Sequence, residues 1–283
     1  MSHRANFVWL ENEDLKIYYS SMGALYSPQL LAQGFLFCKE YFKEFHEHGW
    51  LMDNAWAEGG ILIDVNKFNV LVFGGEDVDW TPALQRHYIK RIKKIWNNWN
   101  VEWCSKGICD FAEYLGIMKE RILSEGCEPN FKELDPNLKL SFSAKKNRTQ
   151  DEVVTIICNN EVIDYKLDWG LDGIDICISK GESLKDIFPV RYKIVKWRNE
   201  VETTDCMLVD YDLRHLFVCW GKPRDDRHIE ATRDIWKNWE VTKQTEGLRF
   251  HFDYTNRNFD QVELTDGEFE KKYLFLFKWD DDK

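Results

Sequence analysis

Acidic side chains beside two glycine pairs are the most promising chemical groups in this chain. Gly59-Gly60 opens one apolar run and Gly74-Gly75 closes the next, and the carboxylates nearest to these pairs belong to Glu58, Asp64, Glu76 and Asp77. Gathered at one end of a sheet, four carboxylates would bind a divalent cation through oxygen or support hydrolysis. The second half of the chain keeps only Asp210 at a matching position, so such a site would exist once. We expect no resident metal and no cofactor.

The Gly74-Gly75 turn has two interpretations. A glycine-rich turn between a strand and a helix can bind an anion through its backbone N–H groups. The letters around it fit neither GxGxxG nor a P-loop, and Glu76 and Asp77 would repel a phosphate. A turn that leads into the next helix is therefore favoured. Asp64 and Asp210 end matching strands, where aspartate commonly forms turns, so the structural interpretation is favoured for them too.

Polar residues at the start of the first predicted strand complete the candidate ligand site. Arg4 and Asn6 open that strand, and the second half has Asp151 and Val153 in their place. If the protein binds a ligand, these two residues are candidates equal to the Gly59-Gly60 loop. The candidate ligand-binding residues are Arg4, Asn6, Glu58, Gly59, Gly60, Asp64, Gly74, Gly75, Glu76 and Asp77.

Familiar catalytic and metal-binding motifs are missing from the sequence. The eight cysteines include no CxxC pair, and none pairs with a histidine at zinc-finger spacing. His46 and His48 are two residues apart in a predicted helix, so they would point to different faces and make a poor metal pair. No serine lies in GxSxG, and no cysteine has an obvious base nearby in the sequence. Whether the protein is an enzyme stays open at this point.

The composition indicates a globular, acidic protein. Of the 283 residues, 44% are hydrophobic and 13 are tryptophan, which is enough for the packed core of two domains. The net charge of −11 argues against binding to a nucleic-acid backbone and would suit docking on a basic partner. The first residues lack a signal-peptide pattern, and no apolar run approaches the length of about 18 residues that spans a membrane. We expect a cytoplasmic protein with free thiols and no membrane association.

An internal duplication is the strongest pattern in the sequence. Residues 59–101 return in degraded form as residues 207–241, and the WNNW motif returns as WKNW. Tryptophans kept in both copies predict shared core packing. The separation between matching residues is 147 for Asn12, Tyr18 and Gly23 with Asn159, Tyr165 and Gly170, 146 for Asp64 and Gly75 with Asp210 and Gly221, and 140 for Trp96, Trp99 and Gly107 with Trp236, Trp239 and Gly247.

Hydrophobic periodicity predicts the elements of each copy. In the first copy we expect hairpins over 6–20 and 61–73, helices over 35–48 and from Pro82, a strand over 99–103 and a short amphipathic segment over 107–115. Gly23 and Pro28 should interrupt regular structure, and Gly49 should end the first helix. Strands at 155–158 and 162–167 repeat the first hairpin. A strand over 138–142 is an option, and KKYLFLFKW near the C-terminus is strongly β in character.

These elements predict an α+β fold made of two tandem copies of a β-hairpin–helix–β-hairpin–helix–strand unit. The copies should pack with pseudo-twofold symmetry, or alternatively share one continuous sheet. Residues 1–118 form the first repeat, 119–150 the connecting segment and 151–283 the second, diverged repeat.

Several motifs resemble an uncharacterised family of bacterial proteins. They are RANFVWLEN, YYSSMGAL, NAWAEGGILID, VLVFGGED and IWNNWNVEWCSKGICDFAEYLG. The resemblance covers residues 4–116 closely and the second half only through the internal repeat. Met22 departs from the pattern, which has a tryptophan at that position. The resemblance implies a bacterial origin and assigns no activity or site.

Three functions follow as hypotheses. The first is a cytosolic interaction protein, such as an immunity or phage-defence component, that binds another protein. The second is a sensor that binds a small molecule or nucleotide between the two lobes, and the third is a carboxylate-dependent hydrolase. The acidic charge and the lack of a catalytic motif favour the first.

Overall fold

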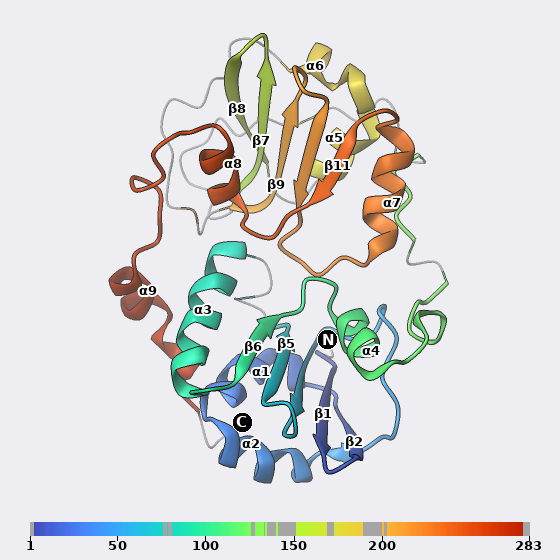
Figure 1. Ribbon diagram of the computed structural model, residues 1–283, viewed down its shortest axis with the longest axis vertical. Helices are drawn as coiled ribbons and strands as arrows, with labels where there is room; N and C mark the ends of the chain where they lie inside the picture. The colour runs from blue at the N-terminus through green and yellow to red at the C-terminus, as the bar shows by residue number, and fades with distance from the viewer. Residues whose placement is uncertain are drawn as a thin grey trace.

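The chain forms two α+β halves, each built on its own mixed sheet (Figure 1). The computed structural model describes residues 3–75, 78, 81–125, 128–132, 134, 140, 151–168, 173–188, 200 and 203–279. The two sheets are separate, so the expected α+β duplication holds and the alternative of one continuous sheet is wrong. Glu76, Asp77, Gly170 and most of the optional strand over 138–142 lie outside the described residues.

The first half contains a six-stranded sheet in the order β3-β2-β1-β4-β5-β6. Its strands are β1 (Ala5–Glu11), β2 (Asp14–Ser20), β3 (His46–Glu47), β4 (Gly59–Asp64), β5 (Asn69–Phe73) and β6 (Asn100–Trp103). Its helices are α1 (Gly23–Ala32), α2 (Phe35–Tyr41), α3 (Pro82–Ile95) and α4 (Ile108–Leu115), with the 3₁₀ turns η1 (Phe42–Glu44) and η2 (Lys119–Arg121).

The second half contains a five-stranded sheet in the order β11-β10-β9-β7-β8. Its strands are β7 (Asp151–Cys158), β8 (Glu161–Asp168), β9 (Thr203–Asp210), β10 (His215–Cys219) and β11 (Glu240–Lys243). Its helices are α5 (Gly173–Lys180), α6 (Leu184–Ile187), α7 (Asp226–Ile235) and α8 (Leu248–Tyr254), with the 3₁₀ turn η3 (Gly181–Ser183). The chain ends in α9 (Asp266–Tyr273) and η5 (Leu274–Phe277).

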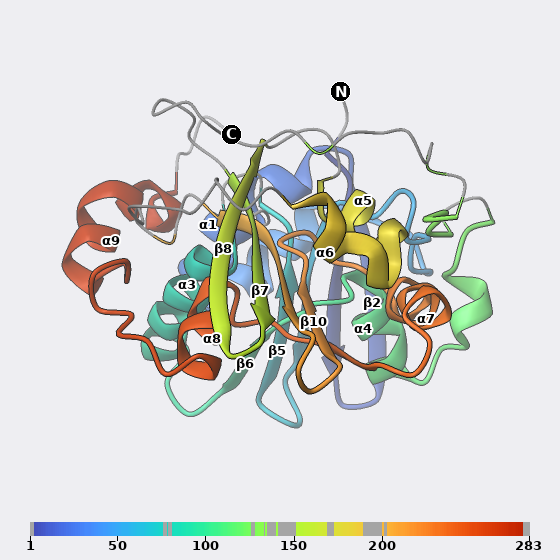
Figure 2. The ribbon, with the colours of Figure 1, turned by 90° about the horizontal axis from the view of Figure 1, so that it is seen from above.

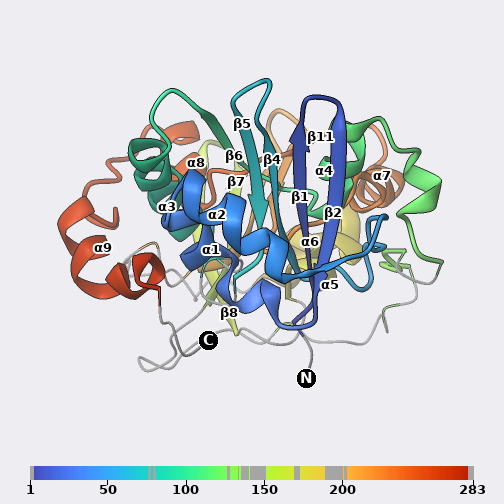
Figure 3. The same ribbon diagram turned by 90° about the horizontal axis from the view of Figure 1, so that it is seen from below.

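Side chains that alternate along the strands give each sheet two packed faces. In the first half, Phe7 and Ile61 pack with α1, α2 and α3 on one face. Val8 and Leu62 pack with α4 on the other. Figure 3 shows α1 and α2 crossing the first sheet. The second half repeats this arrangement with α5 and α7 on one face and α8 on the other, and Figure 2 shows its strands from above.

The strand registers and a tryptophan hydrogen bond that occurs in both halves confirm the duplication. Asp64 faces Asn69 across the β4–β5 hairpin, and Asp210 faces His215 across β9–β10, as the 146-residue separation requires. The Trp96 Nε1 group donates to the carbonyl of Leu31 at 2.8 Å. The Trp236 Nε1 group donates in the same way to the carbonyl of Ile178 at 3.0 Å. Both indoles are buried, so the expected packing role is confirmed.

Reciprocal contacts relate the two halves by a pseudo-twofold axis. A Cβ atom at Gly107, before α4, would lie 3.1 Å from Pro223, which precedes α7. A Cβ atom at Gly247, before α8, would lie 2.9 Å from Pro82, the first residue of α3. Both glycines have positive φ, so the close approach and the backbone conformation both favour glycine there.

Each half also receives an arm from the chain that follows the other half. Phe131, after the first half, belongs to the hydrophobic core of the second. Phe269 and Leu276, after the second half, belong to the core of the first. Figure 1 shows the C-terminal arm, in red, beside α3. By sequence this arm belongs to the second repeat, and by packing it belongs to the first half.

The C-terminal arm corrects the expected strand over KKYLFLFKW. Thr265 and Glu268 form a reciprocal capping box that starts α9, and η5 follows without a strand pairing. Aromatic side chains that suggested a strand instead cover α1 and α3, with Phe277 stacked on Tyr88. The acidic residues of α9 face the basic side of α3, where Lys90 lies 2.7 Å from Asp266. That basic side therefore faces the arm.

Two further expectations about helices are wrong. Gly23 and Pro28 do not interrupt regular structure, because Gly23 starts α1 and Pro28 lies inside it. The predicted helix over 35–48 ends near Tyr41, continues as η1 and then becomes β3. Phe42 and Phe45 both pack on Phe7, and this shared contact explains the apolar spacing.

Candidate functional site between the two halves

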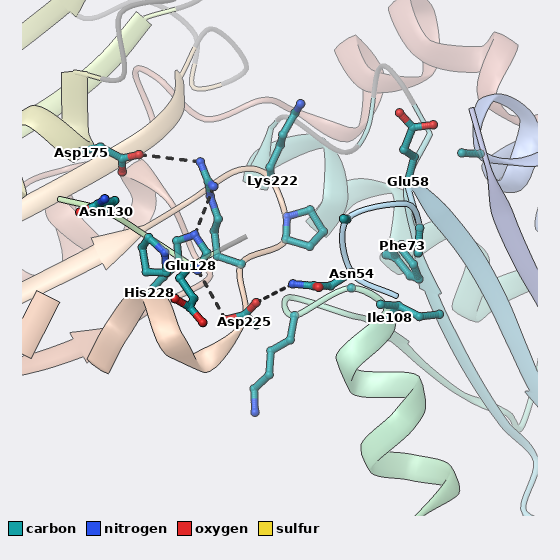
Figure 4. Close-up of a pocket in the computed structure, with 18 of the residues that line it drawn as sticks. Asn54, Glu58, Phe73, Ile108, Glu128, Asn130, Asp175, Lys222, Asp225 and His228 are labelled. Atoms are coloured by element: carbon teal, nitrogen blue, oxygen red, sulfur yellow. Dashed lines mark hydrogen bonds and ion pairs between the residues drawn. The ribbon is translucent and has the colours of Figure 1, made fainter. Parts of the chain in front are cut away.

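A cavity of about 720 Å³ lies where the two halves meet (Figure 4). That volume is within the range of about 300–1,000 Å³ usual for small-molecule sites. The first half lines it with Asn54, Ala55, Ala57, Glu58 and the turn before α4. The second half lines it with Asp175, residues 222–225 and His228, and residues 128–131 of the connecting arm complete the wall.

A chain of charged and polar side chains forms the second-half wall. The Arg224 Nη1 group lies 3.2 Å from His228 Nε2, and Arg224 Nη2 lies 3.9 Å from Asp175 Oδ2. His228 is 7% exposed, and within the described residues its Nδ1 atom and Arg224 Nε are buried without a hydrogen-bond partner. Figure 4 shows Asp175 and His228 on the same side of the cavity. The wall thus offers hydrogen-bond donors and acceptors close together.

Asp225 connects this second-half wall to the first half. It caps α7 by accepting from the Arg227 backbone N–H at 3.0 Å, and it accepts from Asn54 Nδ2 of the first half at 2.9 Å. His228 Nδ1 lies 3.6 Å from its Oδ1 atom. Burial alone would raise the pKa of Asp225, but His228 and Arg227 outweigh it and hold that pKa below its usual range. Asp225 is therefore an ionised anchor at the cavity edge.

The same positions in the first half are packed without charge. His228 corresponds to Tyr88, and Asp175 corresponds to Pro28. In the first half, the Tyr88 hydroxyl donates to the Pro28 carbonyl at 2.9 Å, and the ring is fully buried. The fold therefore closes this position with a tyrosine and a proline. The second half places a histidine, an arginine and an aspartate there, which the packing of the repeat does not require.

Asp205 extends the charged region behind the wall. It corresponds to Gly59, and its Oδ1 accepts from the Gly221 backbone N–H at 2.7 Å. Burial raises the pKa of Asp205 to about 6, and the nearby carboxylate of Asp175 adds to the rise. The first half needs glycine at this position because a Cβ atom at Gly59 would lie 2.8 Å from Ala24.

Some of the predicted site residues line the cavity, and others have structural roles. Glu58 and Gly75 line it. Gly59, Gly60 and Gly74 lie at the same end of the sheet but are packed against backbone and core side chains. Gly74-Gly75 is a turn in which both residues have positive φ, and its anion-binding interpretation stays untested because Glu76 and Asp77 are outside the described residues.

Arg4 and Asn6 hold the 49–58 segment in place. The guanidinium of Arg4 lies 4.0 Å from the centre of the Trp56 ring, and its backbone N–H donates to Glu58 Oε2 at 2.9 Å. Asn6 is fully buried, and its Oδ1 accepts from the Met52 backbone N–H at 2.8 Å. Both residues thus position the cavity's first-half wall from behind.

The expected cluster of four carboxylates does not form around Asp64. Glu58 precedes β4 and Asp64 ends it, so a six-residue strand of about 20 Å separates them. Asp64 instead accepts from the Lys67 backbone N–H at 3.0 Å and from the Tyr114 hydroxyl at 2.7 Å. Asp210 repeats both interactions through Leu213 and Tyr254, so the two aspartates hold hairpin turns.

The second half contains another buried polar network that the sequence analysis missed. Thr155 Oγ1 lies 2.8 Å from His251 Nδ1 and donates to Asp164 at 2.7 Å, and Arg257 pairs with Asp164. The corresponding first-half residues are apolar: Val8, Phe111, Ile17 and Ile117. Both polar groups could have been found from the sequence by aligning the two copies and looking for positions where one copy is apolar and the other is charged.

His46 and His48 also differ from expectation. His46 lies on the edge strand β3 and His48 follows it, so they are not on a helix, and their ring centres are 6.2 Å apart. His48 packs on Trp50, with ring centres 3.8 Å apart. Among the described residues, no group of three or more histidine, cysteine or acidic side chains is placed to hold a metal ion.

None of the helices within the described part of the chain is long and apolar enough to cross a membrane. Comparisons of the chain with protein-family models, with curated proteins and with solved structures find no match. The duplicated fold and the cavity between its halves are therefore the findings from which a function must be argued.

Proposed function

We propose that the protein binds a small polar molecule in the cavity between its halves. The supporting observation is the wall of Asp175, Arg224 and His228, which occupies positions that the first half fills with Pro28 and Tyr88. His228 is 7% exposed, and the side chains of Arg224 and Asp175 are 33% and 20% exposed, so the wall is only partly hydrated. Partly buried polar groups cost folding free energy unless they are well paired. Their presence in one copy, beside a cavity, therefore favours a role in binding.

The wall would recognise polar groups of both signs. Arg224 and Lys222 supply cationic donors, while Asp175 and Glu58 supply acceptors on opposite sides of the space (Figure 4). Phe73 and Ile108 add apolar surface from the first half. This mixture suits a ligand of metabolite size with both charged and apolar parts, as in the sensor hypothesis.

Native mass spectrometry of the full chain, gently purified from its own host, tests the proposal. We expect a retained small-molecule mass in the wild type, and its loss in Arg224→Gln and in His228→Tyr, which installs the first-half residue. Arg214→Gln is the matched control, because Arg214 is exposed in the β9–β10 turn away from the cavity. The proposal fails if the cavity variants, folded to the same melting temperature, retain the mass, or if no mass is retained by the wild type.

A protein partner is the second candidate, and two exposed tryptophans favour it. Trp50 is 62% exposed and Trp56 is 53% exposed. Both lie in the 49–58 segment, part of which lines the cavity. Exposed tryptophans are typical anchors of protein interfaces. The narrower role of an immunity or phage-defence component stays a prediction, as does a cytoplasmic location.

Affinity capture with the full chain distinguishes this second candidate. Trp50→Ala and Trp56→Ala should each remove a stoichiometric partner that the wild type retains. Phe68→Ala is the control, because Phe68 is equally exposed at 55% but lies in the β4–β5 turn. Equal capture by all three variants would exclude the segment as a docking surface.

A further inference from the structure

The reciprocal contacts between the halves have a consistent charge polarity. Lys106 Nζ lies 3.1 Å from Asp226 Oδ1, and Arg86 Nε lies 3.7 Å from Glu246 Oε2. These are the same pair of positions in the two copies, because Arg86 corresponds to Asp226 and Lys106 to Glu246 at the 140-residue separation. The first half supplies the cation in both pairs, and the second half supplies the anion.

Contacts at a second pair of matching positions, Asn54 and Glu200, have the same polarity. Asn54 corresponds to Glu200, and their backbone N–H groups donate to the matching carbonyls of Ile122 and Val262. Across the interface, Asn54 donates to Asp225, whereas Glu200 accepts from Arg86. The Glu200 side chain is 1% exposed, so its charge is neutralised inside the interface.

This polarity decides which halves can pair. Two first halves related by the same axis would bring Arg86 against Lys106. Two second halves would bring the buried Glu200 toward Asp225 and Asp226. An uncompensated buried charge costs several kcal/mol, more than an exposed ion pair contributes. Pairing of unlike halves satisfies every one of these groups.

We propose that charge selects which halves pair across this interface, so that each half pairs with a half of opposite polarity and not with a copy of itself. The partner that fits the first half is thus a second half, from the same chain or from another copy of it. The two arms strengthen the selection, because each supplies core residues to the half across the interface. This inference does not depend on whether the cavity binds a ligand.

Two full-length variants test the selection by charge. Lys106→Glu places an anion against Asp226, and Asp226→Lys places a cation against Lys106. Refolded alone, each should melt below the wild type. Refolded together near millimolar concentration, where pairing between chains competes with pairing within one chain, they should exchange halves and form mixed dimers. In a mixed dimer, the two substituted positions would meet with opposite charges at one interface, and the other interface would be wild type.

Native mass spectrometry measures the result, since the two variants can carry different isotope labels. We expect about tenfold more dimer in the mixture than in either variant alone, equivalent to roughly one relieved charge repulsion. Lys43→Glu mixed with Glu40→Lys is the control, because that ion pair lies within the first half. We also expect the double variant Lys106→Glu with Asp226→Lys to recover part of the melting temperature within one chain.

Three results would overturn the inference. The first is a mixture that contains no more dimer than the single variants. The second is a control mixture that gains as much dimer on mixing, and the third is a double variant that recovers none of the lost melting temperature.

Discussion

The Asn54 side chain donates to Asp225 Oδ2 over 2.9 Å, and this hydrogen bond crosses from one half of the protein to the other at the edge of the cavity. Asp225 also caps α7 and accepts from the Arg227 guanidinium at 2.9 Å. One carboxylate thus holds the helix start, the cavity wall and the interface together. Changes at Asp225 should therefore affect all three.

The first prediction concerns the acid stability of this anchor. The pKa of Asp225 is lower in the folded protein than the value of about 3.9 in the unfolded chain, so the ionised carboxylate stabilises the fold above that pH. The contribution is lost as the pH falls from about 4 toward the folded pKa. Urea unfolding of wild type and Asp225→Asn between pH 2 and pH 7 checks this. The free energies of unfolding should differ at pH 7 and converge at the acid end, whereas a constant difference would contradict it.

The second prediction concerns Asp205, whose pKa is raised rather than lowered. Burial holds that pKa at about 6, so the folded state binds a proton more tightly than the unfolded chain. The contribution of Asp205 to stability should therefore rise as the pH falls from about 7 through 6 toward 4. Asp205→Asn keeps an oxygen for the Gly221 N–H and removes the charge, so it should raise the melting temperature at pH 7.5 and remove this part of the pH dependence. A variant less stable than wild type at pH 7.5 would count against it.

The third prediction concerns the buried His251. Burial holds its pKa at about 3, with the charge of Arg257 adding to the effect, so the neutral form is favoured in the fold. In the unfolded chain this histidine takes up a proton near pH 6.5, so its contribution to stability is lost as the pH falls from about 6.5 to about 3. His251→Phe installs the residue of the first half and should flatten the stability profile over that range. Scanning calorimetry at several pH values measures it, and an unchanged slope would refute the assignment.

The fourth prediction concerns the tryptophan hydrogen bonds. Trp96→Phe and Trp236→Phe each remove the indole donor to a buried carbonyl, of Leu31 or Ile178. Each should lose about 0.5–1.5 kcal/mol of unfolding free energy for the lost hydrogen bond, plus a packing loss. Because the two indoles have the same role, the two losses should be similar. Chemical denaturation compares them directly, and a much larger loss in one half would mean that the copies have diverged in their cores.

The fifth prediction concerns the C-terminal arm. Phe269 is 3% exposed in the core of the first half, and Phe269→Ala should cost about 3–5 kcal/mol. Phe275→Ala is the control, because Phe275 is 44% exposed on the same arm. If the arm is part of the first half, hydrogen exchange should accelerate in α1 and α3 of the Phe269 variant. Faster exchange confined to residues 265–279 would show that the arm is dispensable.

The sequence determined the duplication and most of the elements, because both depend on local periodicity and on registers that two copies must share. Asp64 with Asp210 and Trp96 with Trp236 could be matched without coordinates, and their turn-forming and packing roles are visible in the residue types. The helix starting at Pro82 and the segment ended by Gly116 were also predictable from their caps.

Tertiary structure alone decided where distant residues meet. The path of the C-terminal arm depends on which apolar surface remains uncovered after both halves form. The wall forms where Asp175 of α5 meets Arg224 and His228 at the start of α7, which lies far from α5 in the sequence. No local pattern encodes such a meeting, because burial and pairing of charges arise only when elements distant in sequence pack.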